Sequence, residues 1–202
     1  MGRGKNKGSN FEREICKKLS LWWTDGQNDD IFWRTASSGG RATQRSKKKQ
    51  KTFGQYGDVQ ATDPIGQPLI DLCNIELKRG YSSETFANLI ETHQNPKVKS
   101  CLYERFIKQA IMDCRIRDDG SEWILMVKRD GREAILLTSF SFYNSIHLST
   151  NKPIPKFPII KMQVKIEHHW KKIFGMQLKD FLSNITPKMI LHIWRRKYGK
   201  TK

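Results

Sequence analysis

Residues 57–78 have the sequence GDVQATDPIGQPLIDLCNIELK, which predicts a short strand, a turn and a longer strand. Successive side chains of a strand point to opposite faces, so Glu76 and Lys78 share one face, roughly 7 Å apart. A turn at residues 63–66 that folds the strands into a hairpin would bring Asp58 beside Glu76. Two carboxylates and one ammonium would then meet in one pocket, which is a minimal site for a hard divalent cation and an activated water.

Two interpretations of the pair Glu76 and Lys78 compete. Such a pair on a strand is usually a solvated ion pair. Ile70 and Leu72, however, lie on the same predicted face as the pair, and a strand with apolar residues on both faces tends to be buried on both sides. Buried charges are rare unless they are paired or bind a metal, so this context favours a functional site.

The composition indicates one domain with appendages and a polyanionic partner. The chain has 202 residues, of which 37% are hydrophobic and 10% aromatic, enough for a packed core. Its net charge is +17, from 37 Lys and Arg against 20 Asp and Glu. Nucleic acid, and DNA in particular, is the first candidate partner, but a purely structural binder would also be basic. The charge therefore predicts the partner and leaves the activity open.

The cysteines and the apolar segments exclude several other classes of protein. The four cysteines lie far apart without a C-x-x-C pair, which is neither a zinc pattern nor a disulfide framework: Cys16, Cys73, Cys101 and Cys114. No apolar run approaches the length of a membrane span, and the basic N-terminus has no apolar segment typical of a secretory signal. We expect a soluble, intracellular protein without a membrane partner, encoded by a bacterium, an archaeon or a phage.

The N-terminal part of the chain predicts a basic arm, a helix, a strand and a basic loop. Residues 1–8 form the arm, and Ser9 with Glu12 is a capping-box pattern that begins the helix. Glu12 is either this capping partner or an acid at the edge of the buried face. A strand follows at residues 31–35. Six basic residues and no acidic one lie between it and Asp58, as expected of a loop that orders on a phosphate backbone: Arg41, Arg45, Lys47, Lys48, Lys49 and Lys51.

The remainder predicts an α/β protein with a mixed central sheet flanked by helices. Helices are expected at residues 82–93 and 101–115, and an antiparallel pair of strands at 122–128 and 133–138. Three prolines mark residues 151–158 as a linker or an extended edge, and residues 164–198 look helical. The predicted division is a basic arm (1–8), a core (9–150) and a proline-rich linker with a basic helical extension (151–202).

Four short motifs occur in an order and spacing that resemble the PD-(D/E)xK nuclease superfamily. They are Gly8-x-x-x-Glu12-Arg13 at a helix start, Arg34-x-x-x-Ser38-Gly39, Gly57-Asp58-Val59 and Ile75-Glu76-Leu77-Lys78. The nearest pattern is that of the archaeal Holliday-junction-resolvase-like branch, over about residues 8 to 138. The resemblance implies a restriction-endonuclease-like core and DNA cleavage with Mg²⁺, for which Mn²⁺ would substitute.

The resemblance also assigns roles to individual residues. It implies metal ligands at Asp58 and Glu76, helped by the carbonyl of Leu77, with Glu12 as a helix-borne catalytic acid near the metal. Lys78 would orient or deprotonate the attacking water.

The remaining assignments concern DNA. Arg34 and Ser38 match positions that approach the scissile strand, and Gln109 matches a polar residue on the helix after the core motif. Gly57 stands where proline is usual. The long basic insertion and the C-terminal extension also depart from the pattern, which puts junction specificity in question.

We therefore expect a Mg²⁺-dependent DNA endonuclease that is structure-specific in the manner of junction resolvases. The resemblance to these resolvases, which act as dimers, also suggests a homodimer. The alternatives are a site-specific phage or restriction-type endonuclease that cuts duplex DNA, and a non-catalytic nucleic-acid-binding protein.

Overall fold

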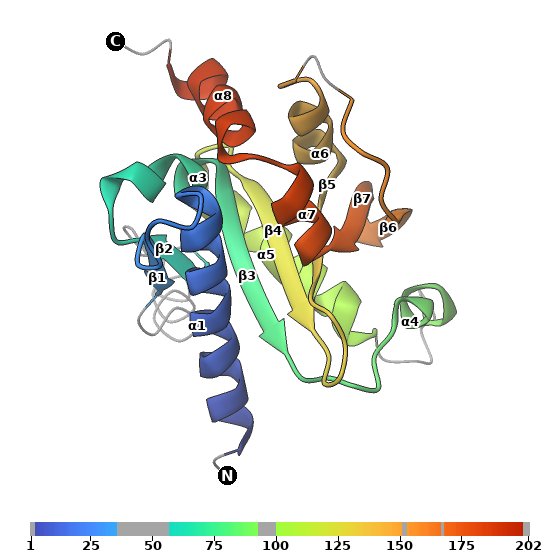
Figure 1. Cartoon of the computed structure of the whole chain (residues 1–202). Helices are drawn as coiled ribbons and strands as arrows, with labels where there is room; N and C mark the ends of the chain where they lie inside the picture. Colours follow the sequence, from blue (N-terminus) through green and yellow to red (C-terminus); the bar gives the residue numbers. More distant parts are fainter. Residues whose placement is uncertain (1–2, 36–56, 93–99, 151–152, 167, 200–202) are drawn as a thin grey trace.

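The computed structural model describes residues 3–35, 57–92, 100–150, 153–166 and 168–199. Its centre is a five-stranded mixed sheet (Figure 1), in which β3 and β4 are parallel and all other neighbours are antiparallel. In spatial order the strands are β3 (Cys73–Arg79), β4 (Glu122–Lys128), β5 (Ile135–Ser139), β7 (His169–Gln177) and β6 (Ile159–Ile166). The predicted fold class, a mixed sheet flanked by helices, is confirmed.

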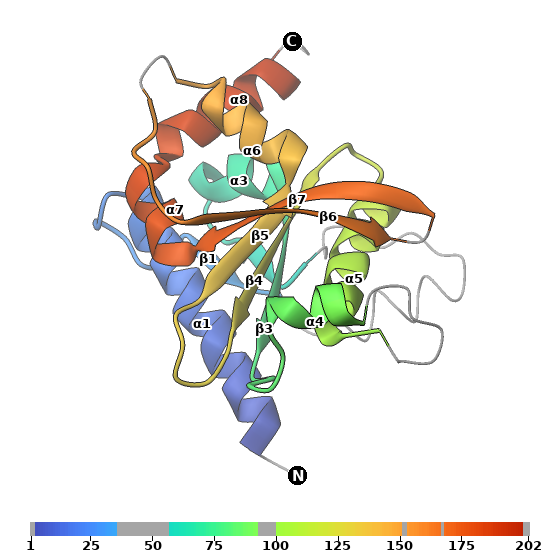
Figure 2. The same ribbon diagram turned by 90° about the vertical axis from the view of Figure 1, so that its right-hand side faces the viewer.

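Helices cover both faces of this sheet (Figure 2). In β4, Ile124 and Met126 join one buried cluster while Trp123, Leu125 and Val127 join the other, as alternation along a strand requires. A strand buried on both sides reads as a continuous apolar run, which explains the sequence of β4. The first face carries α1 (Arg3–Trp23), α6 (Phe140–His147), α7 (Leu178–Asn184) and α8 (Pro187–Tyr198), and the second carries α4 (Phe86–Glu91) and α5 (Leu102–Arg117).

The expected hairpin between residues 57–62 and 67–78 is wrong. Strand β2 (Val59–Ala61) pairs antiparallel with β1 (Phe32–Arg34), and a 3-10 helix, η1 (Pro64–Gly66), leads into helix α3 (Gln67–Leu72) before β3 begins. The side chain of Asp63 accepts a hydrogen bond from the Ile65 N–H and begins η1, while proline is tolerated in the first turn of a helix.

Helix α3 changes the surroundings predicted for the Glu76 strand. Leu69 and Leu72 are both buried, and their spacing of three residues suits a helix. The same short apolar run is also compatible with a strand, so the sequence pattern alone does not decide between the two. Ile70 and Leu72 therefore do not share a strand face with Glu76. The burial of that strand on both sides comes instead from α1 and α5.

Helix α1 begins at Arg3 rather than at Ser9, so the predicted capping box does not form. Lys7 makes a 2.8 Å ion pair with Asp130 in the loop between β4 and β5, which ties this first part of the helix to the sheet. Glu12 lies inside the helix, and its carboxylate is directed toward Arg34 of β1. The other predicted helix starts are nearly correct, with N-caps at Thr85 and Cys101.

The prediction of helix for residues 164–177 is also wrong, because this segment forms the end of β6 and all of β7. The period-two pattern of Met162, Val164 and Ile166 is that of a strand, and β7 pairs with β5 over residues 135–139. Strands β6 and β7, which lie in the predicted C-terminal extension, belong to the same sheet as β3, β4 and β5. The remainder of the segment is helical, as α7 and α8, and α8 begins after the predicted N-cap Thr186 and buries Ile190 in the core.

Two further expectations concern cysteines and membranes. All four cysteines are free, and three of them are buried. Within the described ranges, no helix combines the length and apolarity that crossing a bilayer requires.

Candidate active site

Asp58 is held against the edge of β3 by its backbone and by its side chain. Its N–H donates to the carbonyl of Ile75 at 2.8 Å, and its Oδ2 accepts from the N–H of Leu77 at 2.8 Å. Its carbonyl accepts from the N–H of Thr35 at 3.0 Å. Asp58 thus bonds to the residues before and after Glu76, Ile75 and Leu77, in the way that a neighbouring strand would. The sequence predicted that Asp58 lies beside Glu76, but by way of a hairpin that does not form.

Gly57 makes this approach possible. Its φ is +72°, and a Cβ at this position would lie 2.5 Å from Asn74 Oδ1 and 2.7 Å from the Ile75 carbonyl oxygen. Proline, which fixes φ near −65°, does not fit this conformation, and any other side chain would push the chain off β3. The glycine at the usual proline position is therefore required by the local backbone.

Glu76 lies in the middle of β3 on the face covered by α5, with 4% of its surface exposed. Its Oε2 accepts a hydrogen bond from Lys78 Nζ at 3.2 Å, and Gln109 Nε2 of α5 lies 3.5 Å from the same oxygen. The ammonium of Lys78 also lies 5.7 Å from the ring centroid of Phe106. The competing interpretation of a solvated ion pair does not hold for this buried carboxylate.

Burial and neighbouring charges shift the protonation of both residues. Burial, followed by the negative charge of Asp58, raises the pKa of Glu76 to about 8. Burial lowers the pKa of Lys78, but the carboxylates of Glu76 and Asp58 outweigh burial and raise it. In the protein without a metal, Lys78 is therefore an ammonium at neutral pH.

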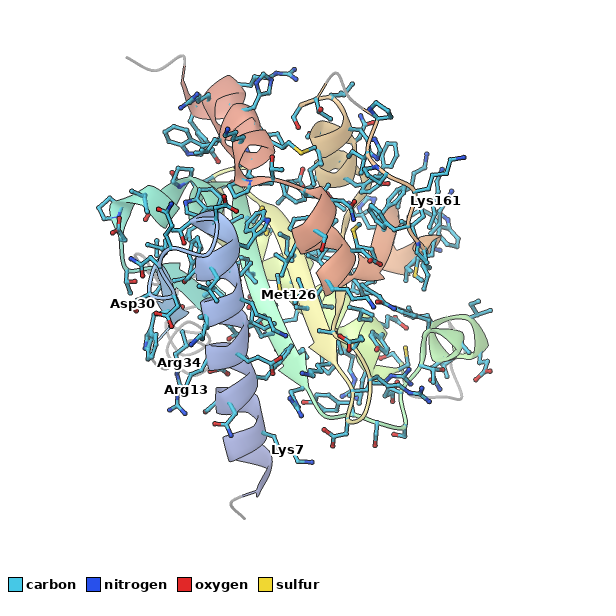
Figure 3. The ribbon with its side chains drawn as sticks, in the orientation of Figure 1. Lys7, Arg13, Asp30, Arg34, Met126 and Lys161 are labelled. Atoms are coloured by element: carbon cyan, nitrogen blue, oxygen red, sulfur yellow. The ribbon has the colours of Figure 1, made fainter. Side chains whose placement is uncertain are left out.

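Glu12 reaches the same region from α1. Its Oε2 lies 3.5 Å from Arg34 Nη1 of β1, and Figure 3 shows the Arg34 side chain beside α1. Partial burial and the charge of Asp58 raise the pKa of Glu12, while Arg34 and Lys78 lower it. Glu12 is thus paired with Arg34 and influenced by the charge of Asp58, and its alternative role as a helix cap is excluded by the position of the helix start.

Asp113 is an acidic neighbour that the sequence analysis missed. It is half-buried on α5, and its carboxyl group is hydrogen-bonded to Glu76 and to Gln109, although burial raises its pKa. A signal for it exists in the sequence, because Phe106, Gln109 and Asp113 follow the i, i+3, i+7 spacing of one helix face.

The site contains several oxygen atoms that could bind a metal, but they do not form a complete coordination sphere. In the part of the chain that the structure describes, no three His, Cys, Asp or Glu side chains are grouped as metal ligands. The donor set nevertheless suits a hard cation, since carboxylates and a backbone carbonyl are the ligands that Mg²⁺ prefers. The raised pKa of Glu76 reflects burial first and the negative charge of Asp58 second, and a dication at this position would favour the ionised carboxylate.

Of the predicted site residues, the structure brings Glu12, Arg34, Asp58, Glu76, Leu77, Lys78 and Gln109 together. The other predicted DNA-binding residues lie outside the described residues: Ser38, Arg41, Arg45, Lys47, Lys48, Lys49 and Lys51.

A comparison with protein families matches residues 3–192 to the family described as "Phage putative PDDEXK endonuclease". The chain belongs to this family. No curated protein and no solved structure matches it. Membership of the PDDEXK endonuclease family confirms the PD-(D/E)xK superfamily, while the archaeal resolvase branch stays a prediction. The match also extends beyond residue 138, the predicted limit of the resemblance, and includes β6, β7 and part of α8.

Proposed function

We propose that this PDDEXK family member hydrolyses DNA phosphodiester bonds at the site formed by Asp58, Glu76 and Lys78. The observation that carries the proposal is the attachment of Asp58 to the β3 edge on both sides of Glu76, which brings two carboxylates and the Lys78 ammonium together. Family membership supports a nuclease, and the net charge of +17 supports a nucleic-acid substrate.

The carboxylates of Asp58 and Glu76 would hold Mg²⁺ or Mn²⁺, with the Leu77 carbonyl and Glu12 as further oxygen ligands. A bound dication supplies an activated water and neutralises the charge that develops on the phosphate. Two observations support this assignment. All the proposed ligands are oxygen atoms, which hard dications prefer. The pKa of Glu76 is raised by burial and by Asp58, so a dication at this position would replace the proton that Glu76 holds.

Lys78 would act as a fixed positive charge. Its pKa is raised by Glu76 and Asp58, so it keeps its proton near pH 7 when no metal is bound. An ammonium hydrogen-bonded to Glu76 can orient the attacking water or a phosphate oxygen by donation. Of its two predicted roles, orientation of the water is therefore favoured over its deprotonation.

Gln109 and Arg34 would contact the DNA on either side of the carboxylates. Both reach the site from separate elements, α5 and β1, and both are paired there with an acid. The charged Arg34 would contribute to an affinity that falls steeply with salt, whereas the neutral amide of Gln109 can contact the DNA only by hydrogen bonds. The basic residues of the 39–56 segment stay predicted DNA contacts.

Specificity for branched DNA is our finer proposal, and cleavage of duplex DNA at defined sites is the alternative. A homodimer and an intracellular location stay predictions. Supercoiled plasmid, linear duplex and a synthetic four-way junction should be compared in Mg²⁺, in Mn²⁺ and in EDTA. We expect cleavage in both metals, none in EDTA, and preference for the junction.

Asp58→Asn provides the matched test of the site. The amide oxygen can keep the bond from Leu77 N–H but lacks the negative charge, so the variant should fold and bind DNA yet lose cleavage by at least about a hundredfold. Glu133→Gln removes a charge from an exposed glutamate and serves as the control. Full cleavage by Asp58→Asn would contradict the assignment. DNA binding without cleavage by the wild type would favour the non-catalytic alternative.

A further inference from the structure

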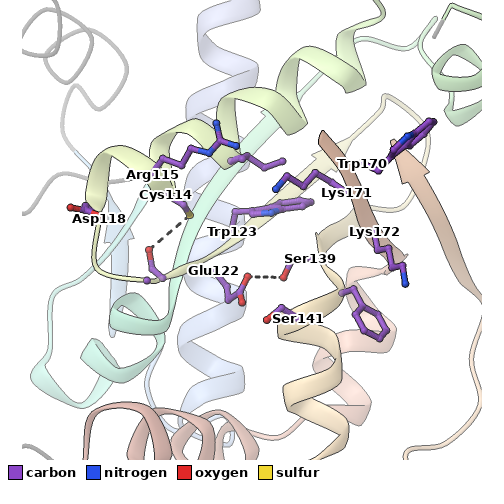
Figure 4. A pocket seen from close by; sticks show the side chains of 14 residues that line it. Cys114, Arg115, Asp118, Glu122, Trp123, Ser139, Ser141, Trp170, Lys171 and Lys172 are labelled. Atoms are coloured by element: carbon purple, nitrogen blue, oxygen red, sulfur yellow. Dashed lines mark hydrogen bonds between the residues drawn. The ribbon is translucent and has the colours of Figure 1, made fainter. Parts of the chain in front are cut away.

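A groove of about 500 Å³ lies beside α5, outside the site of Glu76 (Figure 4). Cys114 and Arg115 of α5 line it, whereas Asp113, one position earlier, is hydrogen-bonded to Glu76. The two sites are therefore neighbours on different sides of the same helix. Because a helix with its side chains is about 10–12 Å across, a strand of a few nucleotides would suffice to connect them.

The first residues of β7 form the outer wall of this groove. The pairing of β5 with β7 ends at Ser139 and Ile173, so residues 170–172 extend beyond the end of β5. Trp170 is 60% exposed, and Figure 4 shows it at the margin, with Lys171 and Lys172 following it along the strand. An exposed tryptophan is thus followed directly by two lysines.

A second aromatic ring lies beside the lysines of this wall. Phe140, the first residue of α6, is 38% exposed, and Lys172 Nζ lies 5.6 Å from its ring centroid. The acidic groups of the groove are Asp118 and Glu122, and the Glu122 carboxylate accepts a hydrogen bond from Ser139 Oγ at 2.6 Å. The cations Arg115, Lys171 and Lys172 outnumber these two acids.

Aromatic side chains beside lysines are the chemistry that recognises unpaired nucleotides. Bases stack on aromatic rings and lysines contact the phosphates, and this binding tolerates any base because each has a flat face. Bases within a duplex are stacked on each other and expose only their edges, so a duplex leaves Trp170 without a partner base.

We propose that the groove lined by Trp170, Lys172 and Phe140 binds a single-stranded segment of the DNA substrate. This inference rests on the proposed nuclease activity and goes beyond its proposed preference for branched DNA, since it adds a feature of the substrate: branched DNA in which unpaired nucleotides adjoin the cleaved strand, such as a flap, should bind more tightly than a fully paired junction. The groove holds the unpaired segment while the site at Glu76 acts on the strand on the other side of α5.

Binding in EDTA tests the groove without cleavage. We would measure the fluorescence anisotropy of a labelled 12-nucleotide single strand and of a blunt duplex of equal length. Trp170→Ala combined with Lys172→Ala should weaken binding of the single strand about tenfold and leave duplex binding within about twofold, since the double variant removes a stacking surface that only an unpaired base can use. Lys179→Ala combined with Leu148→Ala, which removes an exposed lysine and an exposed apolar side chain elsewhere, is the matched control.

Trp170→Phe keeps an aromatic face and should restore most of the single-strand affinity in the presence of Lys172. Unchanged single-strand binding in the double variant would overturn the proposal that the groove binds single-stranded DNA. An equal loss of affinity for the single strand and the duplex would overturn it as well. The outcome is separable from the proposed function. A protein that cuts no DNA but loses single-strand affinity in the double variant would overturn only the nuclease, whereas one that cuts DNA with an inert groove would overturn only this inference.

Discussion

The N–H of Leu77 donates a hydrogen bond to the Oδ2 of Asp58 at 2.8 Å, so the side chain of Asp58 replaces a strand partner on the edge of β3. The N–H of Asp58 completes the replacement by donating to the Ile75 carbonyl. These two bonds fix Asp58 relative to Glu76 from both sides. The geometry of the candidate site is thereby a consequence of sheet hydrogen bonding at an edge strand.

Asp58→Ala and Asp58→Asn should therefore differ in stability. Alanine leaves the Leu77 N–H without its partner and should lower the free energy of unfolding by about 1–3 kcal/mol, whereas asparagine can still accept the bond and should lower it by less. Urea denaturation in EDTA measures both. An equal loss in the two variants would mean that the hydrogen bond does not fix Asp58.

Gly57→Ala should damage both the fold and the site. A Cβ at position 57 meets Asn74 Oδ1 at 2.5 Å and the Ile75 carbonyl at 2.7 Å, and φ of +72° is strained for any L-residue. We expect a loss of about 2 kcal/mol or more and displacement of Asp58, with a fall in cleavage greater than the stability loss explains. Gly131→Ala, at a glycine of φ +70° with open space around it, is the control for backbone strain alone.

The stability of the metal-free protein should fall as the pH rises from about 4.5 to about 8. Burial and Asp58 raise the pKa of Glu76 from 4.5 to about 8, so in this window the folded protein keeps a proton that the unfolded chain has released. The stabilisation is complete below pH 4.5 and is lost as the pH rises through 8. Burial raises the pKa of Glu12 as well, which acts in the same direction.

Glu76→Gln removes the titrating group and should flatten this profile. The glutamine amide fills a similar volume without a charge to bury, so the variant should exceed the wild type in stability near pH 8, by on the order of a few kcal/mol. Thermal unfolding in EDTA between pH 5 and 8 measures both proteins. A wild type whose stability rises across this range would contradict the protonation of Glu76.

Asp113→Asn should shift the same profile to lower pH. The charge of Asp113 contributes to the raised pKa of Glu76, and asparagine removes that charge while keeping a polar group near Gln109. The pH at which stability is lost should therefore decrease relative to the wild type. An unchanged profile would mean that Asp113 is not coupled to Glu76.

The sequence predicted the elements that carry one clear period and missed those whose spacing fits two structures. Residues 122–128 of β4 are apolar on both faces, and α5 repeats its apolar residues at helical spacing, so both were predicted nearly to the residue. Residues 67–72 contain Leu69 and Leu72, whose spacing suits a helical turn, within a run that also alternates. In residues 169–177, which were expected to be helical, the pairing of β7 with β5 selects a strand through partners distant in sequence, which no local pattern contains.

The candidate site shows the same division. Asp58, Glu76 and Lys78 were found because they lie in short motifs, although the hairpin expected to join them is absent. Asp113 was missed because its partner Glu76 is on β3, far away in the sequence.

Cleavage by Glu76→Gln under single-turnover conditions tests the central claim most directly. Because this variant is expected to be at least as stable as the wild type, loss of activity cannot be attributed to unfolding. We predict that, with protein in excess over plasmid and Mg²⁺ present, wild type and Glu133→Gln cut the DNA while Glu76→Gln binds it and leaves it intact, as does the wild type in EDTA. Cleavage by Glu76→Gln at the wild-type rate would show that the reaction does not depend on this carboxylate and would contradict the account.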